Sequence, residues 1–285
     1  DDALEFRRGV RVVLRAAQLH KGHHPEPQLP PIEIGLIALD PRQAVAQIDV
    51  VDAIAAHLGQ RAVAARLEQR HGIATLCLEM DLADAAAVAR LPDLIARRQV
   101  GLLVYVACHS VIGEYLQISL ADKLKMVDVN VRGPLLLIDA LAPAMQRRGH
   151  GGILLMSSLS GFQGSAMVAT YAATKAFDTV LAEGLWSELQ EDGVDVLALV
   201  AGATHTPTFD ALTPRHRQKT VYPMQPDAVV REALQQLGRR PTHIAGRLNR
   251  VVNWVLRRIL SRRNAIRFIS HNTKRVYRDE HGRTD

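Results

Sequence analysis

The stretch Gly101-Leu-Leu-Val-Tyr-Val-Ala107 (GLLVYVA) contains no charged residue and no alternation of polar and apolar positions. A run of this kind is typical of a strand that is buried on both faces of a parallel sheet. Gly152–Ser157 and Val194–Val200 are similar runs, and segments with helical spacing, Leu120–Arg148 and Thr170–Gln190, separate the three. This alternation predicts an α/β fold with a doubly wound parallel sheet.

Further segments on both sides of these strands complete the expected domain plan. Ile73–Glu79 is predicted as a strand and Ala83–Arg98 as an Ala-rich helix. Residues 204–225 contain turn formers and little periodicity, which is typical of a lid loop after a strand. We expect three regions: an atypical segment over residues 1–60, the doubly wound domain over 61–245, and a basic amphipathic helix and tail over 246–285.

The positive charge of the chain is concentrated near its C-terminus. The 285 residues carry a formal net charge of +6, but residues 239–285 contain 13 basic and 3 acidic residues, a local charge of +10. The other 238 residues therefore carry −4, and no nucleic-acid partner is expected for them. Aromatic residues form only 4% of the chain, which also argues against a base-stacking surface. The 48% of apolar residues is enough to build a large core, which excludes a disordered chain.

The cysteines and the N-terminal residues predict a cytoplasmic protein. Cys77 and Cys108 lie in apolar runs, which favours buried thiols over a disulfide. The sequence contains no uninterrupted run of about 18 apolar residues, the length that a membrane span needs, and its first residues do not resemble a secretory signal. His20, His23 and His24 have no Cys or carboxylate at ligand spacing, so we interpret them as part of a solvated loop and expect no metal site.

The motif with the clearest chemistry is Tyr171-Ala-Ala-Thr-Lys175, at the start of a predicted helix. Residues four apart share one face of a helix, so the ammonium of Lys175 can lie near the phenol of Tyr171. A free tyrosine has a pKa near 10, and a fixed cation lowers that pKa toward the range of an acid or base catalyst. The motif alone is weak, because it arises by chance in roughly a third to a half of chains of this length.

Two more polar residues make the pattern specific. Ser158 ends the strand before this helix, thirteen residues ahead of Tyr171, and Asn130 lies 28 residues before Ser158. This order and spacing resemble the Asn, Ser, Tyr and Lys tetrad of the short-chain dehydrogenase/reductase family. The resemblance covers about residues 61–207 and includes the pairs Asp81-Leu82 and Asn130-Val131.

The resemblance implies a Rossmann-like fold and a role for each tetrad residue. Tyr171 would exchange a proton with the substrate oxygen, and Ser158 would hydrogen-bond the same oxygen. Lys175 would lower the Tyr171 pKa and hold the nicotinamide ribose, and Asn130, in a helix kink, would anchor a water that links Lys175 to solvent. The hydride would come from NADP or NAD, with NADP slightly favoured. The positions that match cofactor-binding residues are Asp81, Leu82, Ala107, Tyr171, Lys175, Gly202, Thr204 and Thr206.

The expected activity is the interconversion of a carbonyl and a secondary alcohol. The apolar lid and the basic tail suggest a lipid-like, steroid-like or acyl substrate. Family members form dimers or tetramers through the helix that carries the Tyr and the long helix before it, so the resemblance implies a homo-oligomer. The alternative is a catalytically impaired pseudoenzyme that keeps the fold as a binding module or a membrane-associated scaffold.

The sequence departs from the family where the cofactor is expected. The glycine-rich TGxxxGxG turn, which lets the backbone approach a pyrophosphate, should fall near residues 30–41, but only Gly35 is found there. Val106-Ala107-Cys108 stands in place of the family's Asn-Ala-Gly triplet. A frameshift or misassigned start would explain why family-like sequence resumes abruptly near Arg61. Divergence toward a weakly catalytic relative would explain Val106 and Cys108, and both hypotheses stay open.

The C-terminal segment has an amphipathic pattern. Apolar residues recur from Leu248 to Leu260 at helical spacing, and arginines fall mainly on the other faces. A cationic helix of this kind suits peripheral contact with an anionic membrane. The same stripe suits a helix that packs over the substrate cleft or a subunit neighbour, and we favour this packed helix.

Overall fold

A computed structural model describes most of the chain after residue 75. The described residues are 76–91, 93, 99–206, 209, 213 and 221–277, preceded by 65, 68–70 and the backbone of three strands nearer the N-terminus. Most of the predicted lid and the loop with His23 and His24 lie outside these residues, as does much of the helix predicted over Ala83–Arg98. The described part of that helix, α3 (Ala85–Ala89), begins at Asp84, whose side chain accepts a hydrogen bond from the Ala86 N–H.

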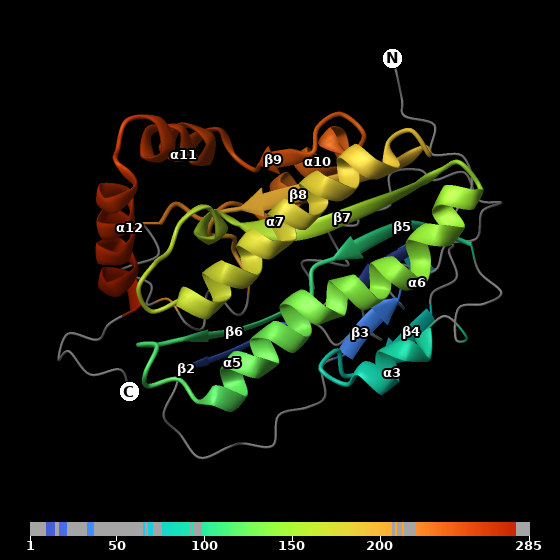
Figure 1. The fold of residues 1–285 in the computed structure, drawn as a ribbon, viewed down its shortest axis with the longest axis horizontal. Helices are drawn as coiled ribbons and strands as arrows, with labels where there is room; N and C mark the ends of the chain where they lie inside the picture. The colour runs from blue at the N-terminus through green and yellow to red at the C-terminus, as the bar shows by residue number, and fades with distance from the viewer. Residues whose placement is uncertain are drawn as a thin grey trace.

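A five-stranded parallel sheet forms the centre of the molecule (Figure 1). Its strand order is β1-β5-β7-β8-β9, and each neighbouring pair is parallel. The prediction of a doubly wound parallel sheet is therefore confirmed. The strands are β1 (Val10–Leu14), β5 (Val100–Tyr105), β7 (Gly151–Ser158), β8 (Val194–Ala201) and β9 (Thr242–Ile244).

Side chains of the central strands alternate between two hydrophobic cores. In β5, Leu103 faces one core and Leu102 the other, and β7 and β8 repeat the alternation. Helices α6 (Gly133–Arg147) and α7 (Ala169–Leu189) cover the first core, and α10 (Pro226–Gln236) covers the second. Because both faces are buried, the strands need no polar alternation, which explains the continuous apolar runs.

The long helical region predicted over Leu120–Arg148 is interrupted by one π-helical turn. α5 (Leu120–Val127) begins at Ser119, whose side chain caps the Asp122 N–H. The π-helical turn Asp128–Arg132 follows, and α6 continues from Gly133. A π turn adds a residue to the helix and so changes which side chain faces inward. Asn130 lies in this turn and is completely buried, as expected for a residue at a helix kink.

Two strands differ from the prediction. The described part of the strand expected over Ile73–Glu79 is β4 (Leu76–Glu79), and it pairs antiparallel with β3 (Glu33–Leu36) instead of joining the parallel sheet. The run Gly101–Ala107 is followed directly by an unpredicted strand, β6 (Cys108–Ile112), which pairs with β2 (Ala17–Lys21). An apolar pattern reports burial but not the pairing partner, and this limit accounts for the difference.

The C-terminal segment forms two helices rather than one. α11 (Arg247–Arg258) is followed by α12 (Arg262–Tyr277), and both lie at the end of the molecule toward which the parallel strands point (Figure 1). Within the described residues, none of the helices combines the length and the apolar character that a membrane crossing requires.

Candidate active site

A cavity of about 460 Å³ lies at the carboxyl ends of β7 and β8. Ligands of open α/β sheets bind at this edge, and the volume is in the range of small-molecule sites. The loop after β7, the start of α7 and the loop after β8 form its walls, and α12 contributes Ile269, Val276 and Tyr277. The cavity is therefore covered by a helix that the sequence did not predict.

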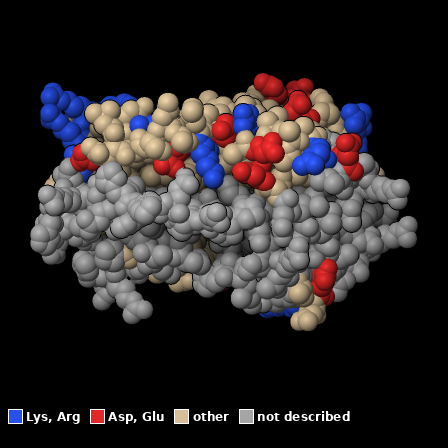
Figure 2. All heavy atoms as spheres, turned by 90° about the horizontal axis from the view of Figure 1, so that it is seen from below, with Lys and Arg blue, Asp and Glu red and all other residues tan. Residues whose placement is uncertain are grey.

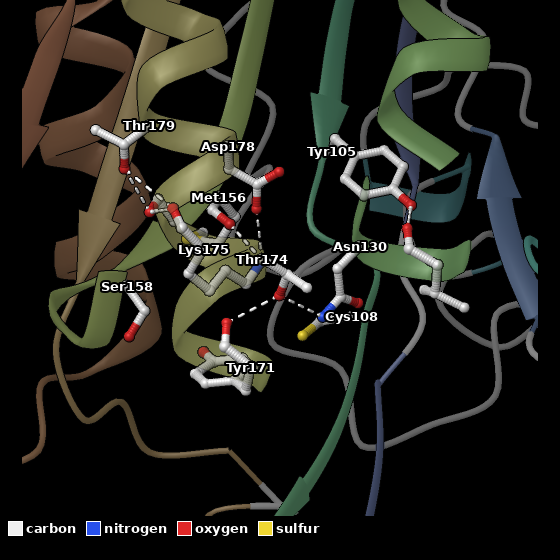
Figure 3. Close-up of polar contacts among 12 residues, drawn as sticks. Tyr105, Cys108, Asn130, Met156, Ser158, Tyr171, Thr174, Lys175, Asp178 and Thr179 are labelled. Carbon is white, nitrogen blue, oxygen red and sulfur yellow. Dashed lines mark hydrogen bonds and ion pairs between the residues drawn. The ribbon is translucent and has the colours of Figure 1, made fainter. Parts of the chain in front are cut away.

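Most of the residues predicted for the site line this cavity. Six of them share it: Ser158, Tyr171, Lys175, Gly202, Thr204 and Thr206. Asp81, Leu82 and Ala107 do not contribute to its walls. Asp81 is exposed and accepts a hydrogen bond from the Ala83 N–H, whereas Leu82 and Ala107 are completely buried. Asn130 does not line the cavity either, and its side chain contacts Thr174 on α7 (Figure 3).

Tyr171 lies near the start of α7, and it lines the cavity together with Lys175 of the same helix and Ser158 at the end of β7 (Figure 3). Burial raises the pKa of Tyr171 to about 12. The charge of Lys175 and a hydrogen bond with Ser158 lower this pKa, which is the direction the sequence predicts for Lys175. The expectation of a lowered net pKa is wrong for this structure, because desolvation outweighs both contributions.

Lys175 forms an ion pair with a carboxylate that the sequence analysis missed. Its Nζ donates to the Met156 carbonyl at 2.7 Å and to Oδ2 of Asp178 at 3.0 Å, and both charged side chains are almost fully buried. Burial lowers the pKa of Lys175, but the charge and hydrogen bond of Asp178, together with the charges of Cys108 and Tyr171, outweigh it, so the pKa is raised. Lys175 therefore stays protonated, and one of its three N–H groups is left for a ligand.

Asn130 ties three elements together behind the cavity. Its Oδ1 accepts from the His109 N–H at 2.8 Å, and its Nδ2 donates to the His109 carbonyl at 2.9 Å and to Thr174 Oγ1 at 3.0 Å. The Thr174 hydroxyl in turn donates to the Tyr171 carbonyl. The amide thus joins the π turn to β6 and to the first turns of α7, and it holds the backbone of Tyr171 in place.

The turn after β7 fixes Ser158 against α7. Ser158 caps a short 3₁₀ turn, Leu159–Phe162, and its Oγ accepts from the Ser160 N–H. Ser157 does not share this role, because its hydroxyl donates to the Lys175 carbonyl inside the core. A side chain at Gly161 would lie 2.8 Å from the backbone of α7, so only glycine permits the approach of this turn.

Two features of the site, Asp178 and the cover formed by α12, lay outside the sequence prediction. Asp178 is three residues after Lys175, a spacing that places oppositely charged side chains together on a helix, and this signal was available. Apolar residues of α12, including Ile269 and Val276, have helical spacing, but the spacing does not show that they cover the cavity. Cys108, which the sequence analysis noted for replacing a glycine, lines the cavity as a free thiol, and burial raises its pKa.

The fold and the cavity are those of a Rossmann-like α/β protein, and comparison with known proteins identifies the family. The family model described as short chain dehydrogenase matches residues 33–217. The chain belongs to this family, as its tetrad spacing predicts. The match begins before residue 61, so it includes part of the segment that the sequence analysis set apart as atypical.

Among individual proteins, the chain is similar to a 7beta-hydroxysteroid dehydrogenase of Clostridium sardiniense, with 33% identity over 61% of this chain and 66% of the relative. Other curated relatives are matched over about half of their length. A solved structure from work on the stereoselectivity of 7beta-hydroxysteroid dehydrogenase has the same fold. Its TM-score is 0.69 at 24% identity, and the match covers 73% of this chain and 82% of that one. A short-chain dehydrogenase of Sphingobium yanoikuyae in complex with NADPH has a TM-score of 0.57 at 28% identity, over 65% and 72% of the two chains.

Proposed function

We propose that this chain is an NAD(P)-dependent oxidoreductase that interconverts a ketone and a secondary alcohol. The observation that supports this proposal is the placement of Ser158, Tyr171 and Lys175 in one cavity at the carboxyl edge of the sheet. The family match and the names of its relatives agree with it. The alternative of a catalytically impaired scaffold draws no support from this geometry, because the reactive side chains lie together.

The donor groups of the cavity fit the nicotinamide riboside part of a cofactor. One ammonium and several hydroxyls, from Lys175, Tyr171, Thr204 and Thr206, line the same walls, and such groups suit ribose hydroxyls and a carboxamide. We propose that Lys175 holds the ribose with its remaining N–H. The pyrophosphate turn expected near residues 30–41 lies outside the described residues, except for the backbone of β3.

In the proposed reaction the cofactor supplies or accepts the hydride. In the reduction direction, the phenol of Tyr171 donates its proton to the substrate oxygen while that oxygen gains negative charge. Ser158 donates a hydrogen bond to the same oxygen and stabilises the charge. The protonated Lys175, held by Asp178, favours the phenolate that is left. In the oxidation direction the same phenolate takes the proton back.

The substrate we propose is steroid-like or lipid-like. Val168, Phe209, Ile269 and Val276 give the cavity apolar walls, and polar side chains, including those beside Tyr171, lie among them. A wall of this kind favours a large apolar body that carries one oxygen at the reactive end. The relative from Clostridium sardiniense is named for a hydroxysteroid, which supports the same class. NADP is the proposed cofactor, in line with the similar chain in complex with NADPH.

Replacing the proton donor tests the proposal. We expect Tyr171→Phe to lower kcat for steroid ketones by about 10²–10⁴-fold, the usual contribution of a general acid. The affinity for NADPH should stay nearly unchanged, because the phenol ring is kept. Tyr115→Phe is the matched control, since Tyr115 is an exposed tyrosine outside the cavity. Turnover retained by the Tyr171 variant would refute the role of this residue.

A further inference from the structure

The apolar stripe of α11 faces solvent instead of the protein. Leu248, Val251 and Ile259 are 53%, 59% and 62% exposed. One member of the stripe, Leu256, is buried together with Asn253 on the side of the helix that faces the protein. The interpretation that this stripe packs over the cleft of its own chain is therefore wrong, whereas packing against a subunit neighbour stays a prediction. Polar anchors account for the orientation of the helix.

These anchors fix α11 through its polar residues. Asn249 Nδ2 donates to the Ala245 carbonyl at 2.8 Å, and Arg250 Nη1 donates to the Ile244 carbonyl and to Glu232, each at 2.8 Å. Gly202 passes directly beneath Asn249, so that a Cβ added there would lie 2.7 Å from the amide nitrogen. The helix is therefore held against the sheet with its apolar stripe outward.

Positive charge surrounds the stripe, and Arg250 is paired with a carboxylate, that of Glu232 on α10. From Arg247 to Tyr277 the chain contains nine Lys and Arg residues and no Asp or Glu. On the face shown in Figure 2, blue side chains gather at the left end, the end of the molecule at which α12 lies in Figure 1. The exposed arginines of this segment are Arg247, Arg257, Arg258, Arg262, Arg263, Arg267 and Arg275.

Two exposed aromatic side chains complete the surface. Trp254 on α11 is 58% exposed and Phe268 on α12 is 53% exposed. Tryptophan is favoured where an apolar medium meets water, because its ring is apolar and its N–H is polar. Apolar residues, arginines and an exposed tryptophan on one helix have the composition of helices that lie in the interface of a bilayer.

We propose that α11 and the first turns of α12 form a docking surface for an anionic lipid bilayer. Leu248, Val251 and Ile259 enter the boundary between headgroups and acyl chains, while the exposed arginines contact lipid phosphates. A second copy of the chain would bring the same positive charge against this surface, so charge complementarity favours lipid over self-association. A nucleic acid would satisfy the arginines but leave the apolar stripe in water.

The docking surface adjoins the cavity. α12 carries Phe268 on its exposed side and contributes Ile269 and Val276 to the cavity wall. Docking through α11 therefore brings the cavity near the bilayer, where a lipid-like substrate would be dissolved. This last step depends on the proposed function, whereas docking itself does not, so binding to vesicles is measured without cofactor or substrate.

The test is flotation of the full chain with vesicles of phosphatidylcholine alone or mixed equally with phosphatidylglycerol. We expect binding to the anionic vesicles only, with a dependence on salt and a blue shift of Trp254 fluorescence. Val251→Asp with Ile259→Asp should abolish binding, whereas Leu116→Asp, at an 88% exposed residue outside the surface, should not.

Arg258→Gln with Arg263→Gln should weaken binding by about 25-fold, the effect of two charges near an anionic membrane. Arg231→Gln with Arg239→Gln, on exposed arginines of α10 and the turn after it, is the charge control.

Several results would overturn the proposal. A wild-type chain that does not float with either kind of vesicle, or that binds both kinds equally, would contradict the proposal. Binding retained by the Val251 and Ile259 variant would show that the stripe is not involved. Displacement from vesicles by duplex DNA would indicate a nucleic-acid surface. A lower molar mass of the same variant in the absence of lipid would indicate that α11 joins two copies of the chain.

Discussion

Lys175 and Asp178 form an ion pair that is almost fully buried, and this pair controls the charge next to Tyr171. Because Asp178 keeps the Lys175 pKa raised against the effect of burial, Asp178→Asn should lower that pKa. Lys175 would then lose its proton in the alkaline range. We expect kcat/KM for ketone reduction to fall at alkaline pH in this variant, under conditions in which the wild type keeps its activity.

The pH profile of kcat/KM is the measurement, and Glu188→Gln is the control, because Glu188 is an exposed carboxylate on the same helix. A structural defect alone would reduce the rate at every pH. Identical profile shapes for the wild type and Asp178→Asn would show that Asp178 does not set the protonation state of Lys175.

Asn130 makes a second residue-scale prediction, on stability. Asn130→Ala leaves the N–H and carbonyl of His109 and the hydroxyl of Thr174 without their amide partner. Buried polar groups without partners cost about 1–3 kcal/mol, so we expect the free energy of unfolding to fall by about 2–3 kcal/mol and Tm by roughly 5–10 °C. Asn264→Ala, at an exposed residue of α12, should change neither value. Equal Tm values for Asn130→Ala and Asn264→Ala in thermal denaturation would show that the hydrogen bonds of Asn130 do not stabilise the fold.

The sequence predicted which residues form the tetrad, but not how they are held. The resemblance to the short-chain dehydrogenase/reductase family, carried by residue type and spacing, identified Ser158, Tyr171 and Lys175 as candidates. The partners of Lys175 were not predicted: the Met156 carbonyl belongs to the backbone, and the i,i+3 spacing of Asp178, although visible, does not show that the pair is buried. The raised pKa of Tyr171 also depends on burial, which a one-dimensional pattern does not report.

At the level of elements, one carboxylate connects three of them. Glu232 on α10 accepts from His243 on β9 at 2.7 Å, from Arg250 on α11 at 2.8 Å and from the Gly246 N–H. Partial burial raises the pKa of Glu232, but these hydrogen bonds outweigh it, and the pKa is lowered. A carboxyl group whose pKa is lowered in the folded state stabilises the fold at pH values above its pKa in the unfolded chain. This stabilisation is lost as the pH falls through the pKa of the folded state.

Glu232→Gln should therefore destabilise the fold by about 1 kcal/mol at neutral pH, a value kept small because the carboxylate is partly exposed. The difference from the wild type should disappear in acid, where the wild-type carboxyl is protonated as well. Urea unfolding at both pH values measures this difference. A difference of the same size in acid would assign the effect to packing instead of charge.

The strands and helices that were predicted well are those whose pattern follows from burial. Gly152–Ser157 and Thr170–Gln190 agree with β7 and α7 to within one residue at each end. The pattern of α11 was also detected, but its exposed face was not, because periodicity shows that a helix is amphipathic and does not show which face finds a partner. The break between α11 and α12 at Ile259–Ser261 has no Pro or Gly to mark it.

For the whole molecule, a second apolar surface supports the expected oligomer. Leu124 and Val127 on α5, Leu135 on α6 and Val180 on α7 are all exposed. We propose that these helices form the contact between copies of the chain, on a face of the sheet distinct from α11. Leu135→Glu with Val180→Glu should convert the oligomer to monomers in light scattering, because the contact would bury unpaired charges. Leu116→Glu is the control, and a wild-type chain that is already monomeric would refute the contact.

The central claim for the whole molecule is that this chain binds a nicotinamide cofactor beside Tyr171, although its glycine-rich turn is not recognisable. Titration of the pure protein with NADPH and with NADH, followed by nucleotide fluorescence, tests it most directly. We predict saturable binding, tighter for NADPH, that survives Tyr171→Phe and is weakened by Lys175→Met. No binding of either nucleotide at millimolar concentration would contradict the claim.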